Sequence, residues 1–226
     1  MRPTPPKDIA VWVFDLDNTL YPAASSLFPQ IDRRMRAFIA DRLDLDLDSA
    51  FRLQKDYYRT YGTTLRGLME NHGTDPGDFL AYVHDIDHGV LAPWPALDAA
   101  LSGLPGRKLI HTNGSGEHAA RVLERLGIAR HFEAIFDIVA AAYVPKPQPE
   151  PYRRMVERYG IAPRTAAMVE DLQRNLAPAA LMGMTTVWVR QDDHPDTPDV
   201  ASDLSHVHHI TDDLPSWLAQ ASRKQK

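Results

Sequence analysis

The chain has 226 residues, 44% of them hydrophobic, which suffices for a buried core and excludes a wholly disordered protein. It carries 25 Lys and Arg against 30 Asp and Glu, and this net charge of -5 argues against binding to the phosphate backbone of nucleic acid. The absence of cysteine excludes disulfides, thiolate metal sites and a cysteine nucleophile.

The first predicted element is a strand over residues 9–14, a continuous apolar run that would be buried on both faces. Asp15 and Asp17 end this run far short of the roughly 20 apolar residues that a membrane span needs. The residues before it are rich in proline and do not have the form of a secretory signal. We therefore expect a soluble cytoplasmic protein without a membrane partner, and we leave its oligomeric state open.

From residue 25 the pattern changes to apolar stripes with helical spacing. These stripes predict four successive helices and no strand as far as residue 92. Pro93 and Pro95 then mark a boundary. We predict an all-helical cap over residues 23–92, inserted into a core formed by residues 1–22 and 93–226.

Beyond the boundary, predicted helices alternate with predicted strands. The helices are expected at 96–101, 117–126, 151–159, 172–182 and 214–221, and the strands at 108–112, 135–139, 165–169, 185–189 and, weakly, 207–210. Such alternation is typical of βαβ units and a parallel sheet. The predicted fold class is α/β, a doubly wound, Rossmann-like parallel sheet with a helical insertion after its first strand.

Polar side chains follow three of these strands, and a lysine lies in a Pro-rich loop before a helix. In open α/β sheets the active groups gather at the carboxyl ends of the strands. We therefore expect one cluster that contains Asp15, Asp17, Thr19, Thr112, Asn113, Lys146, Glu170 and Asp171.

Carboxylates at one sheet edge repel each other unless a cation lies among them. Asp15, Asp171 and, as a further candidate, Glu170 offer the hard oxygen ligands that suit Mg²⁺ together with a substrate phosphate. Next to a metal, one aspartate can attack phosphorus. The pattern therefore predicts a magnesium-dependent site for phosphoryl transfer.

Three further side chains complete such a site. Asp17, two residues after Asp15 in an extended segment, is expected on the same face, where it would protonate a leaving alkoxide and deprotonate water. Thr112 and Lys146 would bind the phosphoryl oxygens. Each residue taken alone is more typical of a turn, a cap or a solvated surface. Their joint occurrence in this order is what favours a phosphoryl-transfer site.

The chain resembles the haloacid dehalogenase-like hydrolase superfamily in four motifs: D-x-D-x-T at residues 15–19, Thr112, Lys146 and the acidic pair at 170–171. The resemblance implies that Asp15 becomes an aspartyl-phosphate and that Asp17 is the general acid and base, with its backbone carbonyl as a magnesium ligand beside Asp171. It also implies supporting roles for Thr19 and Asn175. The acid at Asp17 favours phosphate esters, because the dehalogenases proper lack an acid there.

A narrower resemblance is to the pyrimidine 5′-nucleotidase subfamily. It rests on DLDNTLYP at 15–22, YGTTLRG at 61–67, HDID at 84–87 and VED at 169–171. It implies dephosphorylation of nucleoside 5′-monophosphates, with UMP or CMP favoured. The alternatives are another phosphatase or a β-phosphoglucomutase-like enzyme that acts on sugar phosphates or other small esters, and a non-catalytic binding module that retains the fold.

Candidates for substrate binding are Asn113, Arg66, Tyr57 and His84. An aromatic ring could stack on a base, and Arg66 could contact a phosphate or a base carbonyl. The helical spacing of Tyr57 and its neighbour Tyr58 is nevertheless more typical of core residues. We predict no zinc site, because a fourth ligand at suitable spacing is missing around His194, His206, His208 and His209.

Overall fold

The computed structural model describes residues 8–191 and 203–224. Their strands form one parallel sheet in the order β3-β2-β1-β4-β5-β6, with β1 in the interior and the chain order reversing on its two sides. This arrangement confirms the predicted α/β class. The strands are β1 (Val11–Phe14), β2 (Arg107–His111), β3 (Ala134–Phe136), β4 (Ala166–Glu170), β5 (Thr185–Val189) and β6 (His209–Thr211).

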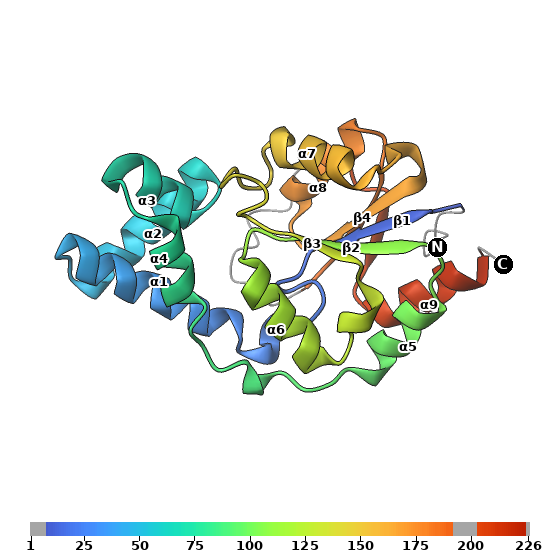
Figure 1. Cartoon of the computed structure of the whole chain (residues 1–226), viewed down its shortest axis with the longest axis horizontal. Helices are drawn as coiled ribbons and strands as arrows, with labels where there is room; N and C mark the ends of the chain where they lie inside the picture. Colours follow the sequence, from blue (N-terminus) through green and yellow to red (C-terminus); the bar gives the residue numbers. More distant parts are fainter. Residues whose placement is uncertain (1–7, 192–202, 225–226) are drawn as a thin grey trace.

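Helices cover both faces of the sheet (Figure 1). One face carries α5 (Pro95–Gly103), α6 (Gly116–Leu126) and α9 (Leu214–Lys224), and the other carries α7 (Pro149–Tyr159) and α8 (Gln173–Leu181). Side chains of β1 alternate between the two layers: Trp12 and Phe14 belong to one apolar cluster, and Val11 and Val13 belong to the other. The first strand is therefore buried on both faces, as its unbroken apolar run predicts.

Residues 15–106, all of which the structure describes, contain helices but no strand. The helices α1 (Phe28–Leu43), α2 (Leu47–Tyr61), α3 (Thr64–His72) and α4 (Pro76–Val83) lie together beyond one end of the sheet (Figure 1). They surround an apolar cluster of their own, in which Phe38 and Phe79 meet edge to face at 5.2 Å between ring centroids. Asp46, Thr63 and Asp75 start three of these helices by accepting backbone N–H groups.

Short 3₁₀ turns at Ala23–Ser25, His88–Val90, Ala129–His131 and Pro163–Thr165 complete the described elements. The strand predicted over 135–139 stops earlier, at Phe136, because Asp137 turns the chain: its carboxylate accepts the backbone N–H groups of Ala140 and Gly116. Across residues 8–191 and 203–224, none of the helices combines the length and apolar character that crossing a membrane requires.

Candidate active site

The carboxyl ends of β1, β2 and β4 meet at one edge of the sheet. Phe14, the last residue of β1, is in register with Ile110 on one side and with Val169 on the other. Pairing continues one residue further, since the Asp15 N–H donates to the Val169 carbonyl at 2.9 Å. The residues that follow these strands are therefore brought together, and Asp15, Thr112 and Lys146 are each at most 6% exposed.

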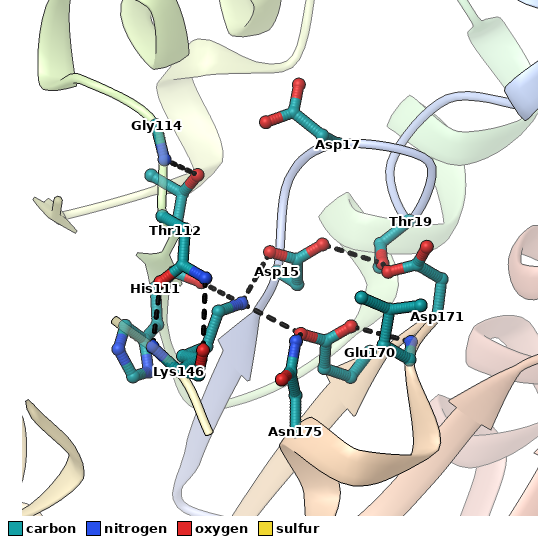
Figure 2. A network of polar contacts seen from close by, with 12 residues as sticks. Asp15, Asp17, Thr19, His111, Thr112, Gly114, Lys146, Glu170, Asp171 and Asn175 are labelled. Carbon is teal, nitrogen blue, oxygen red and sulfur yellow. Dashed lines mark hydrogen bonds and ion pairs between the residues drawn. The ribbon is translucent and has the colours of Figure 1, made fainter. Parts of the chain in front are cut away.

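The ammonium group of Lys146 is the centre of a buried network (Figure 2). Its Nζ donates to Asp15 Oδ1 at 2.6 Å, to Glu170 Oε1 at 2.8 Å and to the His111 carbonyl at 2.9 Å. Burial alone would lower the pKa of Lys146, but Asp15 and Glu170 outweigh it and raise that pKa above its ordinary value. An ammonium has three protons, so all of its donors are engaged within the protein.

The loop that carries Lys146 is held by Asn113. The Asn113 side chain accepts the Lys146 backbone N–H at 2.9 Å and lies 3.4 Å from the Lys146 carbonyl, to which it donates. Asn113 also lines the pocket described below. Asn113, which the sequence predicts as a substrate contact, thus fixes the position of the loop that carries Lys146.

Three carboxylates form a set that is compatible with metal binding. One oxygen each from Asp15, Glu170 and Asp171 lie within 4.8 Å of one another. The Thr19 hydroxyl is 3.0 Å from Asp15 Oδ2 and 3.3 Å from Asp171 Oδ1, and it can donate to either. Burial and the charge of Glu170 raise the pKa of Asp15 to about 7 and that of Asp171 well above its usual range. These carboxyl groups repel each other, and a divalent cation would relieve that repulsion.

Glu170 accepts hydrogen bonds from three residues. In addition to Lys146, it accepts the Asn175 side-chain amide at 2.5 Å and the Leu172 backbone N–H at 2.9 Å. Asn175 therefore contacts the cluster through Glu170. Although burial opposes it, the charge of Lys146 and hydrogen bonds with Asp171, Leu172 and Lys146 keep the pKa of Glu170 below its ordinary value.

The expected orientation of Asp17 is not what the structure has. Its carboxylate points away from Asp15 (Figure 2). Alternation of side chains holds only within an extended strand, and β1 ends at Phe14; the chain then turns, with Asn18 in the left-handed region at φ 59°. Asp17 Oδ1 instead accepts the Tyr21 hydroxyl at 2.5 Å and His118 Nε2 at 2.9 Å.

These two partners also decide the charge of Asp17. Burial alone would raise its pKa, but His118 and the hydrogen bonds from His118 and Tyr21 outweigh burial and hold that pKa at about 2. Asp17 is therefore ionised at neutral pH in this arrangement. A phosphate brought close to it would raise its pKa again, because like charges disfavour the ionised form.

A pocket joins the acidic cluster to the interior of the helices α1–α4. Asn113 and His84 line it beside the acids, and an apolar wall continues into the helices, formed by Phe28, Ile31, Met35, Leu65, Phe79, Leu80 and Val83. Tyr58 lines the same pocket. Asp32 accepts both the Gln54 amide at 2.8 Å and the Lys55 ammonium at 2.9 Å, so a polar cluster interrupts the apolar wall.

Two of the predicted substrate contacts are not brought to this pocket. Tyr57 is buried in the helical cluster, and its hydroxyl lies 2.7 Å from His72 Nε2. Arg66 pairs with Glu70 at 2.5 Å on the surface, beside a separate groove. Tyr57 is thus a core residue, as is typical of a side chain that lies on the apolar stripe of a helix.

The C-terminal histidines make local contacts. His206 Nε2 lies 2.9 Å from the Gln173 carbonyl, and His208 Nδ1 lies 2.8 Å from the Thr186 hydroxyl. His194 lies outside the described residues.

Sequence reasoning missed His118, which lies 101 positions from Asp17 along the chain but 2.9 Å from it in space. One local signal in the sequence indicated His118. Ser115 caps α6 by accepting the His118 backbone N–H, so His118 lies near the start of this helix. Because α6 follows the end of a strand, its first residues lie near the edge of the sheet where the site forms.

A model of the haloacid dehalogenase-like hydrolase family matches residues 9–183. Over 200 residues the chain is 30% identical to Phosphate metabolism protein 8 of Saccharomyces cerevisiae, covering 80% of this chain and 62% of that protein, and thus less than two thirds of the yeast protein. It is also 30% identical to the Glyceraldehyde 3-phosphate phosphatase of Methanopyrus kandleri, covering 81% of this chain and 85% of that protein.

Solved structures share the fold. CbbY from Rhodobacter sphaeroides, in complex with phosphate, aligns with a TM-score of 0.63 at 16% identity, over 93% of this chain and 95% of that chain. L-2-haloacid dehalogenase from Xanthobacter autotrophicus aligns with a TM-score of 0.54 at 16% identity, over 95% of this chain and 97% of that chain. At such identities the likeness concerns the fold alone.

Proposed function

Because the chain belongs to the haloacid dehalogenase-like hydrolase family, we propose that it is a magnesium-dependent phosphatase in which Asp15 attacks the phosphorus of a small phosphate ester. The observation that carries the proposal is the convergence of Asp15, Lys146, Glu170 and Asp171 at one pocket. A nucleophilic carboxylate, a cation and a metal-compatible acid set are the parts that phosphoryl transfer needs.

The reaction has two halves. In the first, Asp17 takes up a proton as the bound phosphate raises its pKa. An oxygen of Asp15 then bonds to phosphorus, the bond from phosphorus to the ester oxygen breaks, and Asp17 gives that oxygen its proton. In the second, water attacks the aspartyl-phosphate, Asp17 takes a proton from the water, and phosphate leaves with Asp15 restored. Asp17 lines the pocket and is positioned by Tyr21 and His118 for both transfers.

The residues for a metal fit Mg²⁺. Asp15, Asp171 and the backbone carbonyl of Asp17 would hold it, and it would offset the negative charge of the carboxylates and of the phosphate. We assign Glu170 to Lys146 rather than to the metal, because its two oxygens already accept three hydrogen bonds. Thr112 lines the pocket, where its hydroxyl would bind a phosphoryl oxygen.

For the substrate we propose a nucleoside 5′-monophosphate, with UMP or CMP favoured. Residues 23–92 would act as a cap that encloses the leaving group and excludes water. The wall of the pocket supports this: it is apolar but contains the polar cluster of Asp32, Gln54 and Lys55, which suits a flat group with polar edges. The Glyceraldehyde 3-phosphate phosphatase among the relatives makes other small phosphate esters the competing class.

Replacement of the nucleophile tests the mechanism. Asp15→Asn should reduce hydrolysis of p-nitrophenyl phosphate to background, whereas the exposed variant Asp212→Asn should retain wild-type rates. In the wild-type chain, borohydride quenching during turnover should place the modified residue at Asp15 by mass spectrometry. Substantial turnover by Asp15→Asn, or full activity of the wild type in EDTA, would overturn the proposal.

A substrate panel with Mg²⁺ tests the specificity separately. It should contain UMP, CMP, purine nucleotides, sugar phosphates and glyceraldehyde 3-phosphate. The proposal expects the highest kcat/KM for a pyrimidine nucleotide. A clear preference for a sugar phosphate or a triose phosphate would replace the substrate assignment and leave the phosphatase assignment standing.

A further inference from the structure

The carboxylate of Asp17 is bound through only one of its oxygens. Both the Tyr21 hydroxyl and His118 Nε2 donate to Oδ1, while Oδ2 receives no hydrogen bond from any residue that the structure describes. A methyl group built on Gly114 would lie 3.6 Å from this second oxygen and 3.3 Å from the Thr112 hydroxyl oxygen. Oδ2 therefore lies close to Gly114, in the segment that follows β2 and begins with Thr112.

The ring of His118 is buried and contacts two other histidine rings. It is 1% exposed, its Nδ1 lies 3.2 Å from His88 Nε2, and His84 stacks on it at 4.4 Å between ring centroids with 10° between the planes. His84 Nδ1 in turn lies 2.9 Å from the hydroxyl of Ser115, the residue that caps α6. The two supporting histidines come from the segment that leads from α4 back to the core.

The hydrogen-bond directions follow from the partners. A carboxylate accepts but cannot donate, so His118 Nε2 carries the proton in its contact with Asp17. His88 Nδ1 faces the Ile86 carbonyl at 3.2 Å and donates to it. Burial lowers the pKa of His84 to about 3, so that ring is neutral and packs on His118 as a flat, uncharged surface.

We propose that His118 is a positioning residue which, together with Tyr21, clamps Oδ1 of Asp17 and so reserves Oδ2 for proton exchange with the substrate. His84 and His88 hold this clamp from the segment that follows α4. The inference rests on the proposed function, because it assigns a support to the acid and base of that reaction. Two donors on Oδ1 fix the orientation of the carboxylate and leave Oδ2 as the oxygen that is available to the substrate.

The leaving group offers a direct test. An alkyl ester such as UMP needs a proton on its departing oxygen, whereas p-nitrophenolate leaves readily without one. For His118→Asn, which removes the donor to Asp17, kcat/KM for UMP or glycerol 3-phosphate should fall by about 10- to 100-fold, and that for p-nitrophenyl phosphate by less than about 3-fold. Tyr21→Phe should show the same selective loss.

Two variants separate positioning from folding. His118→Gln places an amide nitrogen near the former Nε2 and should restore most of the alkyl-ester activity. His131→Asn removes a histidine–aspartate contact of the same kind, His131 with Asp98 at 2.7 Å, outside the pocket, and should leave both substrates unaffected. Equal losses on both substrates, no loss at all, or failure of His118→Gln to restore activity would overturn the clamp.

A measurement without turnover completes the design. In protein labelled with ¹⁵N-histidine, the proton on His118 Nε2 should exchange slowly with solvent, and Asp17→Ala should abolish that protection. Rapid exchange in the wild type would contradict the clamp while leaving the phosphatase proposal intact. A wild-type chain that hydrolyses neither class of ester would instead overturn the proposed function, and with it the catalytic part of this inference.

Discussion

The buried ammonium of Lys146 contacts two buried carboxylates that would otherwise repel each other, and it offsets one of their two negative charges. Lys146 is 2% exposed, and Glu170, its second carboxylate partner, is fully buried. Pairs of this kind add little net stability compared with an apolar replacement of both partners, but the loss of one partner leaves an unpaired buried charge. All three donors of Lys146 are in use, so contact with a phosphoryl oxygen requires that one of them be given up.

We predict that Lys146→Met destabilises the fold by about 3–5 kcal/mol at pH 7, because it leaves Asp15 and Glu170 facing each other without a cation. The matched control is Arg107→Met, which breaks the half-exposed pair of Arg107 with Glu133 and should cost less than about 1 kcal/mol. Urea unfolding followed by circular dichroism measures both. Similar losses in the two variants would show that the buried pair contributes no more to the free energy of unfolding than the half-exposed pair does.

The residues of the site differ in how far the sequence could reveal them. Asp15, Thr112 and Asp171 follow apolar runs, and the edge of a parallel sheet brings such positions together without knowledge of side-chain packing. The orientation of Asp17 depends on a turn just after β1, and the approach of His118 depends on how α6 packs against that turn. Neither follows from periodicity.

Among the elements, α2 and α3 pack so closely that the residue at their contact has no side chain. A Cβ added to Gly67 would lie 2.4 Å from Cγ of Tyr57, a distance that real side chains do not adopt. Gly67 is on α3, and Tyr57 is buried in the helical cluster that borders the pocket. The glycine of the T-L-R-G segment, Gly67, thus allows α2 and α3 to pack this closely.

We predict that Gly67→Ala destabilises the chain by about 1–3 kcal/mol through overpacking, although alanine is the better helix former. Gly103→Ala is the control, since its nearest non-local atom would be the Ser222 hydroxyl oxygen at 3.5 Å, an ordinary contact. Thermal unfolding of the two variants should differ in midpoint. If both glycines tolerate alanine equally, the close contact of α2 and α3 is not rigid.

Element positions were predictable wherever an apolar pattern was long. The strand over 9–14 and the four helices before residue 92 follow directly from their patterns, and only the ends differ. The prediction of a strand over 135–139 failed at its end because one side chain, Asp137, accepts two backbone N–H groups and starts a turn. Periodicity does not report such local competition.

At the scale of the whole molecule, a metal ion bound at the acidic cluster, as proposed, would stabilise the fold. Glu170 is the last residue of β4, and Asp15 and Asp171 directly follow β1 and β4, so their repulsion acts on the middle of the sheet. An ion that binds only the folded chain stabilises all of it by mass action.

We predict that Mg²⁺ at one hundred times its dissociation constant stabilises the wild-type chain by about 2.7 kcal/mol, and that EDTA reverses the effect. Asp171→Asn should remove most of this gain, whereas Asp212→Asn should retain it. Differential scanning calorimetry in the absence of substrate measures the shift in Tm independently of catalysis. A variant lacking Asp171 that gains as much as the wild type would place the ion elsewhere.

The reversal of strand order at β1 has a consequence for how the site can change. Strand β2 and the loop before α7 contribute Thr112, Asn113 and Lys146 from one half of the sheet, while β4 contributes Glu170 and Asp171 from the other. Asp15 and Asp17 follow the central strand, between the two halves. On the proposed roles, substitutions at Thr112 and Asn113 would act on anion affinity, and those at Asp171 on cation affinity. The segment after the central strand and the pair of Lys146 with Glu170, which joins the two halves, are subject to both demands.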